Sequence, residues 1–339
     1  MMRNMEGMGP TGRRIDISQL IKKKEVSSVT QPEHIERYSA KETYEKIKKL
    51  METVSNEQNQ ELRENFGAAT DLIKKDGSIS FESFSIAEGG RYSEQKIKAD
   101  EQFIAERMRE WSGVEEPKTR DHRLDEYRID KNLSNAEQDE LIIERFKEGK
   151  VKTESAKLEA AVSIIFHKIL KSKFLVVRSA EPDDFKEGVD NVMINKETGE
   201  IICTFDEVSE PENGIRIQKK IKDTNRKNAT SGSSVEYGLT FKKDEQGKTK
   251  VMQTRLDHIP SFFLAVAPDE LKNLLMNMEF DPSKPPSPIE LQMFDKFIDA
   301  LKKQAEAAIR GGTRGPTQEN ISKFLKSVGQ IQELRNQFV

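Results

Sequence analysis

Hydrophobic residues recur at two different spacings along the chain, and the change of spacing separates a helical part from a mixed one. Between residues 39 and 150, apolar side chains such as Ile97 and Ile104 recur at helical spacing within highly charged sequence. This spacing predicts amphipathic helices. Ser134 followed by Glu137 is a capping box, which predicts that one of these helices begins there.

After residue 150 the pattern becomes that of an α/β domain. The segment 153–170 predicts a helix with one apolar stripe, and a stripe of this kind packs on a sheet. Asp183 and Asp184 follow Pro182 and are expected in a loop. A basic helix is predicted over 215–227, and another helix over 269–278. Apolar runs of strand length predict strands at 174–177, 189–194, 201–205, 235–241, 251–256 and 262–266.

The two ends of the chain are expected to lie outside this α/β part. Ser287, Pro288 and Glu290 together predict the start of a helix, and a second helix near Pro316 would complete a helical hairpin. The predicted fold is an α/β (α+β) core with a mixed central sheet flanked by helices, plus helical N- and C-terminal extensions. The predicted parts are a flexible tail (1–38), a charged and mostly helical region (39–150), the core (151–280), and a Pro-rich linker with a helical hairpin (281–339).

Charge, cysteine count and the length of apolar runs show which classes of protein the sequence fits. Lys and Arg number 56 and Asp and Glu 59, so the net charge of −3 neither favours nor excludes a nucleic-acid partner. The single cysteine, Cys203, excludes an intramolecular disulfide framework and a Cys-based zinc site, and predicts a reducing, cytoplasmic location. No apolar run approaches the length of about 18 residues that a membrane-spanning helix needs, so no association with a membrane is expected.

The histidines are scattered singly along the sequence and have no partner at metal-ligand spacing. His167 is interpreted as a packing or surface residue.

The strands at 189–194 and 201–205 are joined by turn sequence that ends at Gly199, which is able to adopt a positive φ. If residues 197–199 form a three-residue loop, Asp190 faces Asp206, and a loop one residue shorter sets Asp190 against Glu207. Carboxylates about 4.5–5.5 Å apart repel each other unless a cation or a proton lies between them. Mg²⁺ is the usual cation at such a pair, and the alternative is a set of solvated strand-end carboxylates without function.

The order of these elements over 153–267 resembles the PD-(D/E)XK nuclease superfamily, with its restriction-endonuclease-like core. The resemblance assigns the first acid to Asp190, within Gly188-Val-Asp190, and the second to Asp206. It implies phosphodiester hydrolysis that depends on Mg²⁺ or Mn²⁺. The metal ligands would be Asp190 and Asp206, with Glu159 of the first core helix and, in the shifted register, Glu207.

The sequence departs from the pattern of that superfamily at Val208, where a lysine is expected. In some members the lysine comes from the following helix, which makes Lys219, Lys220 and Lys222 the candidates here. The same helix would contact the phosphates of DNA or RNA without base specificity, or it is simply a solvated face in a chain with 34% charged residues. Its candidate contacts are Lys219, Lys220, Lys222, Arg226 and Lys227.

Two functions are therefore weighed from the sequence. The first is a metal-dependent nuclease. The second is a non-catalytic scaffold or interaction protein that retains the nuclease-like fold and binds proteins through its terminal helices.

Overall fold

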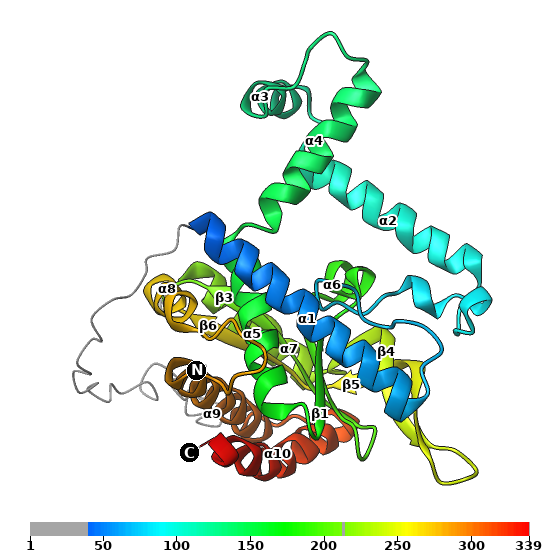
Figure 1. Cartoon of the computed structure of the whole chain (residues 1–339), viewed down its shortest axis with the longest axis vertical. Helices are drawn as coiled ribbons and strands as arrows, with labels where there is room; N and C mark the ends of the chain where they lie inside the picture. The colour runs from blue at the N-terminus through cyan, green and yellow to red at the C-terminus, as the bar shows by residue number, and fades with distance from the viewer. Residues whose placement is uncertain (1–39, 212–213, 339) are drawn as a thin grey trace, which may run out of the picture. The chain divides into compact units, whose positions relative to one another are not determined.

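The structure is a computed structural model, and it describes residues 40–211 and 214–338 (Figure 1). The predicted tail 1–38 lies outside these residues. The described residues form one compact unit by their contacts. In chain order the elements are α1 (Ala40–Phe66), α2 (Glu94–Ser112), α3 (Pro117–Glu126), α4 (Asn135–Lys150), α5 (Glu154–Leu170), β1 (Phe174–Arg178), α6 (Glu181–Glu187), β2 (Asn191–Asn195), β3 (Ile201–Ser209), α7 (Ile215–Ala229), β4 (Ser233–Lys243), β5 (Thr249–Ile259), β6 (Ser261–Val266), α8 (Pro268–Asn277), α9 (Pro288–Arg310) and α10 (Gly315–Arg335).

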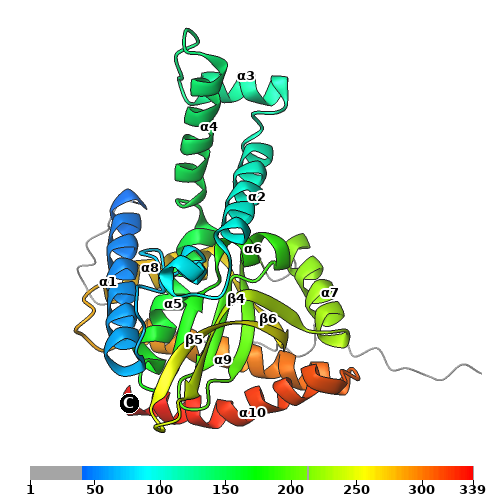
Figure 2. The ribbon, with the colours of Figure 1, turned by 90° about the vertical axis from the view of Figure 1, so that its right-hand side faces the viewer.

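The predicted α/β class with a mixed sheet is confirmed. Four strands pair in the order β1-β2-β3-β6, and β1, β2 and β3 form an antiparallel meander. β6 runs parallel to β3, and parallel neighbours require a crossover, which α7 begins. β4 and β5 lie within this crossover and pair only with each other, as a separate long hairpin (Figure 2).

The two faces of the sheet bury two different hydrophobic clusters. Phe174 and Val176 of β1 point toward α5, where α1, α9 and α10 also contribute apolar side chains. Leu175 and Val177, which alternate with them, point toward the β4–β5 hairpin. Because α1, α5, α9 and α10 share one cluster, the boundaries predicted at residues 150 and 280 do not coincide with a break in the hydrophobic core.

The turn between β2 and β3 differs from the predicted three-residue loop. The N–H of Asn195 donates to the carbonyl of Glu200 at 2.9 Å, so the turn consists of residues 196–199. Gly199 has a φ of 72°, as its position predicts, and a Cβ there would lie 1.7 Å from the carbonyl oxygen of Phe241 in β4. The turn therefore requires glycine both for its backbone conformation and for its contact with the neighbouring hairpin.

A β-bulge shifts the register of the β2–β3 hairpin by one residue beyond this turn. Ile194 pairs with Ile201, but Met193 pairs with Cys203, which leaves Ile202 as the extra residue. The predicted loop was one residue too short, and the bulge adds one residue on β3. The two differences cancel, so the outer end of the hairpin has the predicted register.

Both edges of the four-stranded sheet have backbone groups that are already hydrogen-bonded to other parts of the chain. At β1, the N–H of Ile79 donates to the carbonyl of Arg178 at 3.0 Å, and the N–H of Arg178 donates to Gly77 at 2.9 Å. At β6, the side-chain amide of Gln304 from α9 accepts from the N–H of Phe263 at 3.0 Å and donates to its carbonyl at 2.7 Å. A backbone segment and a glutamine side chain thus satisfy edge groups that a further strand would otherwise pair.

Several local predictions are confirmed and others are wrong. The capping boxes of α4 and α9 are present, at Ser134 and Ser287. Asp183 and Asp184 are not in a loop, because Pro182 lies in the first turn of α6, where its missing N–H costs nothing. No helix in the described part of the chain combines the length and apolar character needed to cross a membrane.

Candidate active site

Asp190 and Asp206 lie side by side at the open end of the β2–β3 hairpin. The neighbouring pair is Asn191 with Phe205, which sets the register. The N–H of Asp190 donates to Asp206 Oδ1 at 3.2 Å, and the N–H of Glu207 donates to Asp190 Oδ2 at 3.2 Å. The predicted juxtaposition is confirmed, and each carboxylate accepts a hydrogen bond from the backbone of the other strand.

A lysine from α7 contacts the second acid. The ammonium of Lys220 donates to Asp206 Oδ2 and forms an ion pair with it. Val208, two residues after Asp206 on the same face of β3, is 3% exposed and apolar. Of the three lysines considered from the sequence, Lys220 reaches the acids, whereas Lys219 and Lys222 are exposed.

Glu207 lies on the opposite face of β3, toward α5. Its Oε1 accepts from the side-chain amide of Asn191 at 2.8 Å, and Asn191 Oδ1 accepts from the hydroxyl of Ser163 at 3.0 Å. Its Oε2 is buried and has no hydrogen-bond partner in the described part of the chain. Glu207 therefore does not share the face that carries Asp190 and Asp206.

Glu159 of α5 is bound by an arginine. Arg178 Nη2 at the end of β1 donates to Glu159 Oε2 at 2.7 Å, while the buried Nε of Arg178 has no partner among the described residues. The carboxyls of Glu159, Asp190 and Asp206 still influence one another through their charges. We refer to Glu159, Asp184, Asp190, Asp206 and Glu207 as the acidic group.

Burial and mutual repulsion make several of these carboxyls hard to ionise. Burial, followed by the charges of Asp206 and Glu159, raises the pKa of Asp190 well above its ordinary value. Burial, followed by the charges of Asp190 and Glu159, does the same to the pKa of Glu207. Burial also raises the pKa values of Glu159 and Asp184, although the cation of Arg178 opposes it at both. Interacting carboxyls of this kind bind and release protons as a group.

Lys220 shows the complementary effect. Burial disfavours its ammonium, but the negative charges of Asp206 and Asp190 outweigh burial and hold the pKa of Lys220 above its ordinary value. Of the ion pairs that the described residues form, Lys220 with Asp206 and Arg178 with Glu159 are the two that involve the acidic group. The five carboxyls of the acidic group therefore outnumber the two cations that contact them.

The carboxylate oxygens of the site suit a hard divalent cation in charge and in donor type. Within residues 40–211 and 214–338, however, no group of three or more His, Cys, Asp or Glu side chains is arranged to hold a metal ion. Asp190 and Asp206 share a face, and Glu159 and Glu207 do not join them there. Asp190 and Asp206 would therefore be the side chains that hold a cation, with Lys220 released from Asp206.

The basic residues of α7 divide into two sets. Lys227 donates to the carbonyls of Glu187 at 2.6 Å and Gly188 at 3.3 Å, so it closes the end of α6. The second set, Lys219, Lys222 and Arg226, is exposed and follows helical spacing along one side of α7. This second set, together with Lys220, is placed to meet a phosphate from solvent, whereas the exposed Arg216 at the start of α7 pairs with Glu210.

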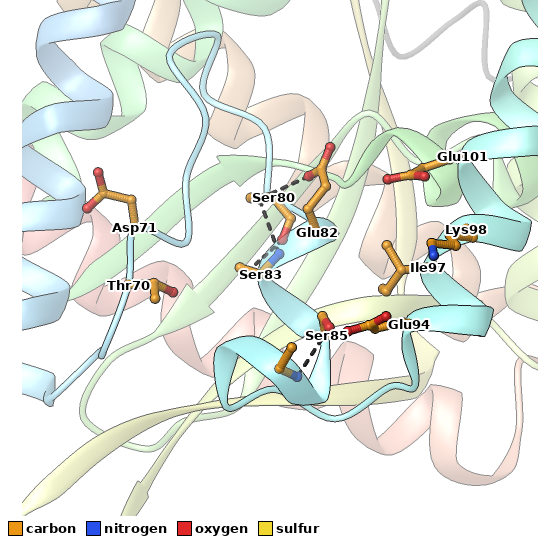
Figure 3. Close-up of a pocket in the computed structure, with 11 residues that line it drawn as sticks. Thr70, Asp71, Ser80, Glu82, Ser83, Ser85, Glu94, Ile97, Lys98 and Glu101 are labelled. Atoms are coloured by element: carbon orange, nitrogen blue, oxygen red, sulfur yellow. Dashed lines mark hydrogen bonds between the residues drawn. The ribbon is translucent and has the colours of Figure 1, made fainter.

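A pocket of about 430 Å³ lies elsewhere in the molecule (Figure 3). It is lined by acidic residues that include Glu82, Glu94 and Glu101, and it contains no member of the acidic group. Glu82 in its wall already accepts hydrogen bonds from Ser80 at 3.0 Å and from Lys74 at 2.7 Å. The pocket therefore provides no extension of the candidate site.

Some residues of the site were not identified from the sequence. Arg178 ends a short apolar strand, and nothing in the local pattern distinguishes it from a solvated strand end. Ser163 is buried on α5, and its hydrogen-bond partner Asn191 lies 28 residues later in the sequence. From the sequence, Asp183 and Asp184 were weighed as added charge for the site but were expected in a loop; the helix α6 places Asp184 where the charges of Lys220 and Arg178 act on it.

Two residues that the sequence placed outside the site stay outside it. Cys203 is buried in the core cluster, and burial raises the pKa of its thiol. His167 is buried, and its Nε2 lies 3.1 Å from Glu57 Oε2 of α1. Both residues have packing roles.

No protein-family model, curated protein or solved structure matches this chain.

Proposed function

We propose that Asp190, Asp206 and Lys220 form the active site of a metal-dependent nuclease that hydrolyses phosphodiester bonds. The observation that carries this proposal is the contact of Lys220 with Asp206, beside Asp190. An ammonium group next to paired carboxylates supplies the positive charge that Val208 lacks. A cluster of buried carboxyls with raised pKa values is also a common property of catalytic sites.

Each residue has a distinct role in this proposal. Asp190 and Asp206 would hold Mg²⁺ or Mn²⁺, which when bound polarises a phosphate and lowers the pKa of a bound water. Lys220, whose side chain is 33% exposed, would orient the phosphate and offset its negative charge. The exposed Lys219, Lys222 and Arg226 would bind flanking phosphates without reading bases.

The alternative is a non-catalytic scaffold, and one observation favours it. Both oxygens of Asp206 already accept from protein donors, Lys220 and the N–H of Asp190, and the described acidic side chains do not form a ready metal site. In this alternative, the ion pair of Lys220 with Asp206 stabilises the fold, and protein partners bind the terminal helices. A reducing, cytoplasmic location stays a prediction from the single cysteine under either reading.

Cleavage assays separate the two functions. The protein is incubated with single- and double-stranded DNA and RNA in the presence of Mg²⁺ or Mn²⁺. Asp190→Asn, Asp206→Asn and Lys220→Met are each expected to lower the rate by roughly 10²- to 10³-fold, because each removes a charge that acts on the reacting phosphate.

Lys219→Met is the matched control, because it removes an exposed charge one residue from Lys220. It is expected to weaken substrate binding slightly and to leave the rate at saturating substrate unchanged. The nuclease proposal fails if no substrate is cleaved under any condition, or if the Asp190 and Asp206 variants cleave as well as the wild type.

A further inference from the structure

Trp111 near the end of α2 is the one tryptophan of the chain, and its side chain is 45% exposed. Large aromatic side chains are usually well buried in folded proteins. One face of the Trp111 ring is covered by Phe185 of α6, with ring centroids 4.7 Å apart and an interplanar angle of 30°. The exposed area of Trp111 therefore belongs to its edges and its other face.

Lys150 at the end of α4 lies beside this aromatic pair. Its ammonium is 4.8 Å from the Trp111 centroid and 5.1 Å from the Phe185 centroid. The two centroids are themselves 4.7 Å apart, so the three points form a nearly equilateral triangle. An ammonium on the outer face of Trp111 would lie much farther from Phe185. The Lys150 ammonium therefore lies close to both rings rather than above the outer face of Trp111 alone, and it places a positive charge beside the pair.

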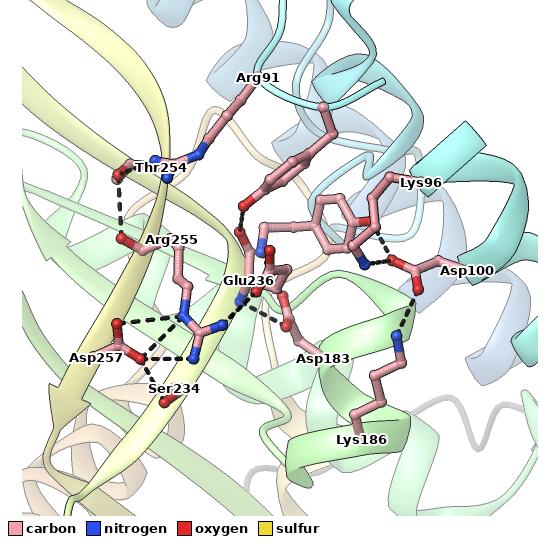
Figure 4. A network of polar contacts seen from close by, with 12 residues as sticks. Arg91, Lys96, Asp100, Asp183, Lys186, Ser234, Glu236, Thr254, Arg255 and Asp257 are labelled. Carbon is pink, nitrogen blue, oxygen red and sulfur yellow. Dashed lines mark hydrogen bonds and ion pairs between the residues drawn. The ribbon is translucent and has the colours of Figure 1, made fainter. Parts of the chain in front are cut away.

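The pair is connected to the candidate active site through α6. Phe185 directly follows Asp184, and Lys150 and Lys220 both act on the Asp184 carboxyl. α6 is fixed in place because Lys186 donates to Asp100 Oδ1 of α2 at 2.5 Å (Figure 4). At the same end of the helix, Lys227 of α7 donates to the carbonyls of Glu187 and Gly188. α6 thus lies between α2 and the basic helix α7 (Figure 2).

We propose that the outer face of Trp111 stacks on a base of single-stranded nucleic acid, with Lys150 beside the adjoining phosphate. Bases expose a flat π face in single strands, whereas neighbouring base pairs cover that face in a duplex. The proposal rests on the nuclease function, and it names single strands as the preferred substrate class. The cations that favour a nucleic acid over an apolar protein segment are Lys147, Lys150 and Lys152 at the end of α4 and Lys219, Lys222 and Arg226 on α7.

The intrinsic fluorescence of Trp111 tests the proposal directly, because the chain contains no other tryptophan. The full-length protein is titrated with oligo-dT, oligo-U and a duplex of equal length, in the presence of EDTA so that nothing is cleaved. Quenching by a single strand at lower concentration than by the duplex is expected. The two oligonucleotides distinguish DNA from RNA.

Variants test the same site by anisotropy of a labelled oligonucleotide. Trp111→Leu and Lys150→Met are each expected to weaken binding of the single strand by roughly 10-fold. Met252→Ala, which alters another half-exposed apolar side chain on β5, is the control and is expected to bind as the wild type does. Circular dichroism checks that each variant is folded.

Unchanged fluorescence at saturating oligonucleotide, or equal binding by Trp111→Leu and the wild type, would overturn the stacking proposal. The outcome is independent of catalysis, because Asp190→Asn is expected to bind and quench normally. Quenching without cleavage in Mg²⁺ would remove only the nuclease function. Cleavage without any response of Trp111 would remove only the stacking site.

Discussion

Lys168 and Glu290 form a buried ion pair between α5 and α9, and the acidic group forms a second set of buried charges in the same molecule. Lys168 Nζ donates to Glu290 Oε1 at 2.8 Å and to the carbonyl of Glu279 at 2.5 Å. Glu290 Oε2 accepts from the backbone N–H groups of Ser287 at 2.7 Å and Glu279 at 3.1 Å. One cation meets one anion there, and both carboxylate oxygens are hydrogen-bonded.

The acidic group has neither property. Its carboxyls exceed the cations that contact them, and the buried Glu207 Oε2 and Arg178 Nε lack partners among the described residues. Burying a charge costs free energy at both sites. At the Lys168–Glu290 pair, the opposite charge and the hydrogen bonds compensate this cost, whereas in the acidic group they do not. The difference indicates that the ion pair serves the fold, whereas the acidic group is suited to a ligand that brings positive charge.

The largest effect is expected from breaking the satisfied pair. Lys168→Met leaves the Glu290 carboxylate buried without a cation, and it should lower the free energy of unfolding by about 3–5 kcal/mol. Urea denaturation measures this value. Lys303→Met is the control, because it removes an exposed partner of Asp299 on the same helix α9 and should change stability by less than about 0.5 kcal/mol. A loss below about 1 kcal/mol for Lys168→Met would show that the buried Lys168–Glu290 pair stabilises the fold no more than an exposed ion pair does.

A smaller effect of opposite sign is expected in the acidic group. Asp190→Asn removes a repelled carboxyl while its amide is able to donate to Asp206, so stability at neutral pH should increase by about 1 kcal/mol. Folded Asp190 keeps its proton above the ordinary pKa of 3.8, whereas the unfolded chain has released it. The wild type therefore loses stability as pH rises from about 4 toward neutrality, and the variant should lose less. Equal pH profiles for the two proteins would contradict the raised pKa.

The smallest effect is expected at Glu207. Burial raises the pKa of Glu207 and so favours the neutral carboxyl in the folded protein, and Gln has the same shape and can still accept from Asn191. Glu207→Gln should therefore change the unfolding free energy by less than about 1 kcal/mol, as measured in urea at neutral pH. A loss above about 2 kcal/mol would show that a charged carboxylate at Glu207 supports the fold.

Sequence patterns were sufficient for much of the fold and for the centre of the candidate site. Strict alternation in β4 and apolar runs in β1, β2 and β3 identified these strands, because burial on known faces fixes which residues are apolar. Asp190 and Asp206 were matched correctly although the turn was not. Turn length and the bulge at Ile202 depend on the contact of Gly199 with β4, which no local pattern contains.

Other features depend on contacts between residues distant in sequence. α3 buries only Leu124, so no apolar stripe predicts it. Which of three lysines reaches Asp206 depends on the rotation of α7 about its axis, and only Lys220 turns inward. Arg178 is important because Glu159, 19 residues earlier, lies above it on α5.

The closed edges of the sheet restrict how this protein can associate with other chains. A partner that adds a strand needs a row of free backbone donors and acceptors, and such a row also promotes aggregation. Gly77 and Ile79 bind the backbone of Arg178 in β1, and the Gln304 amide binds the backbone of Phe263 in β6. Recognition of other molecules is therefore expected to use side chains on helices, and Gln304→Ala would free the N–H and carbonyl of Phe263 for strand addition at β6.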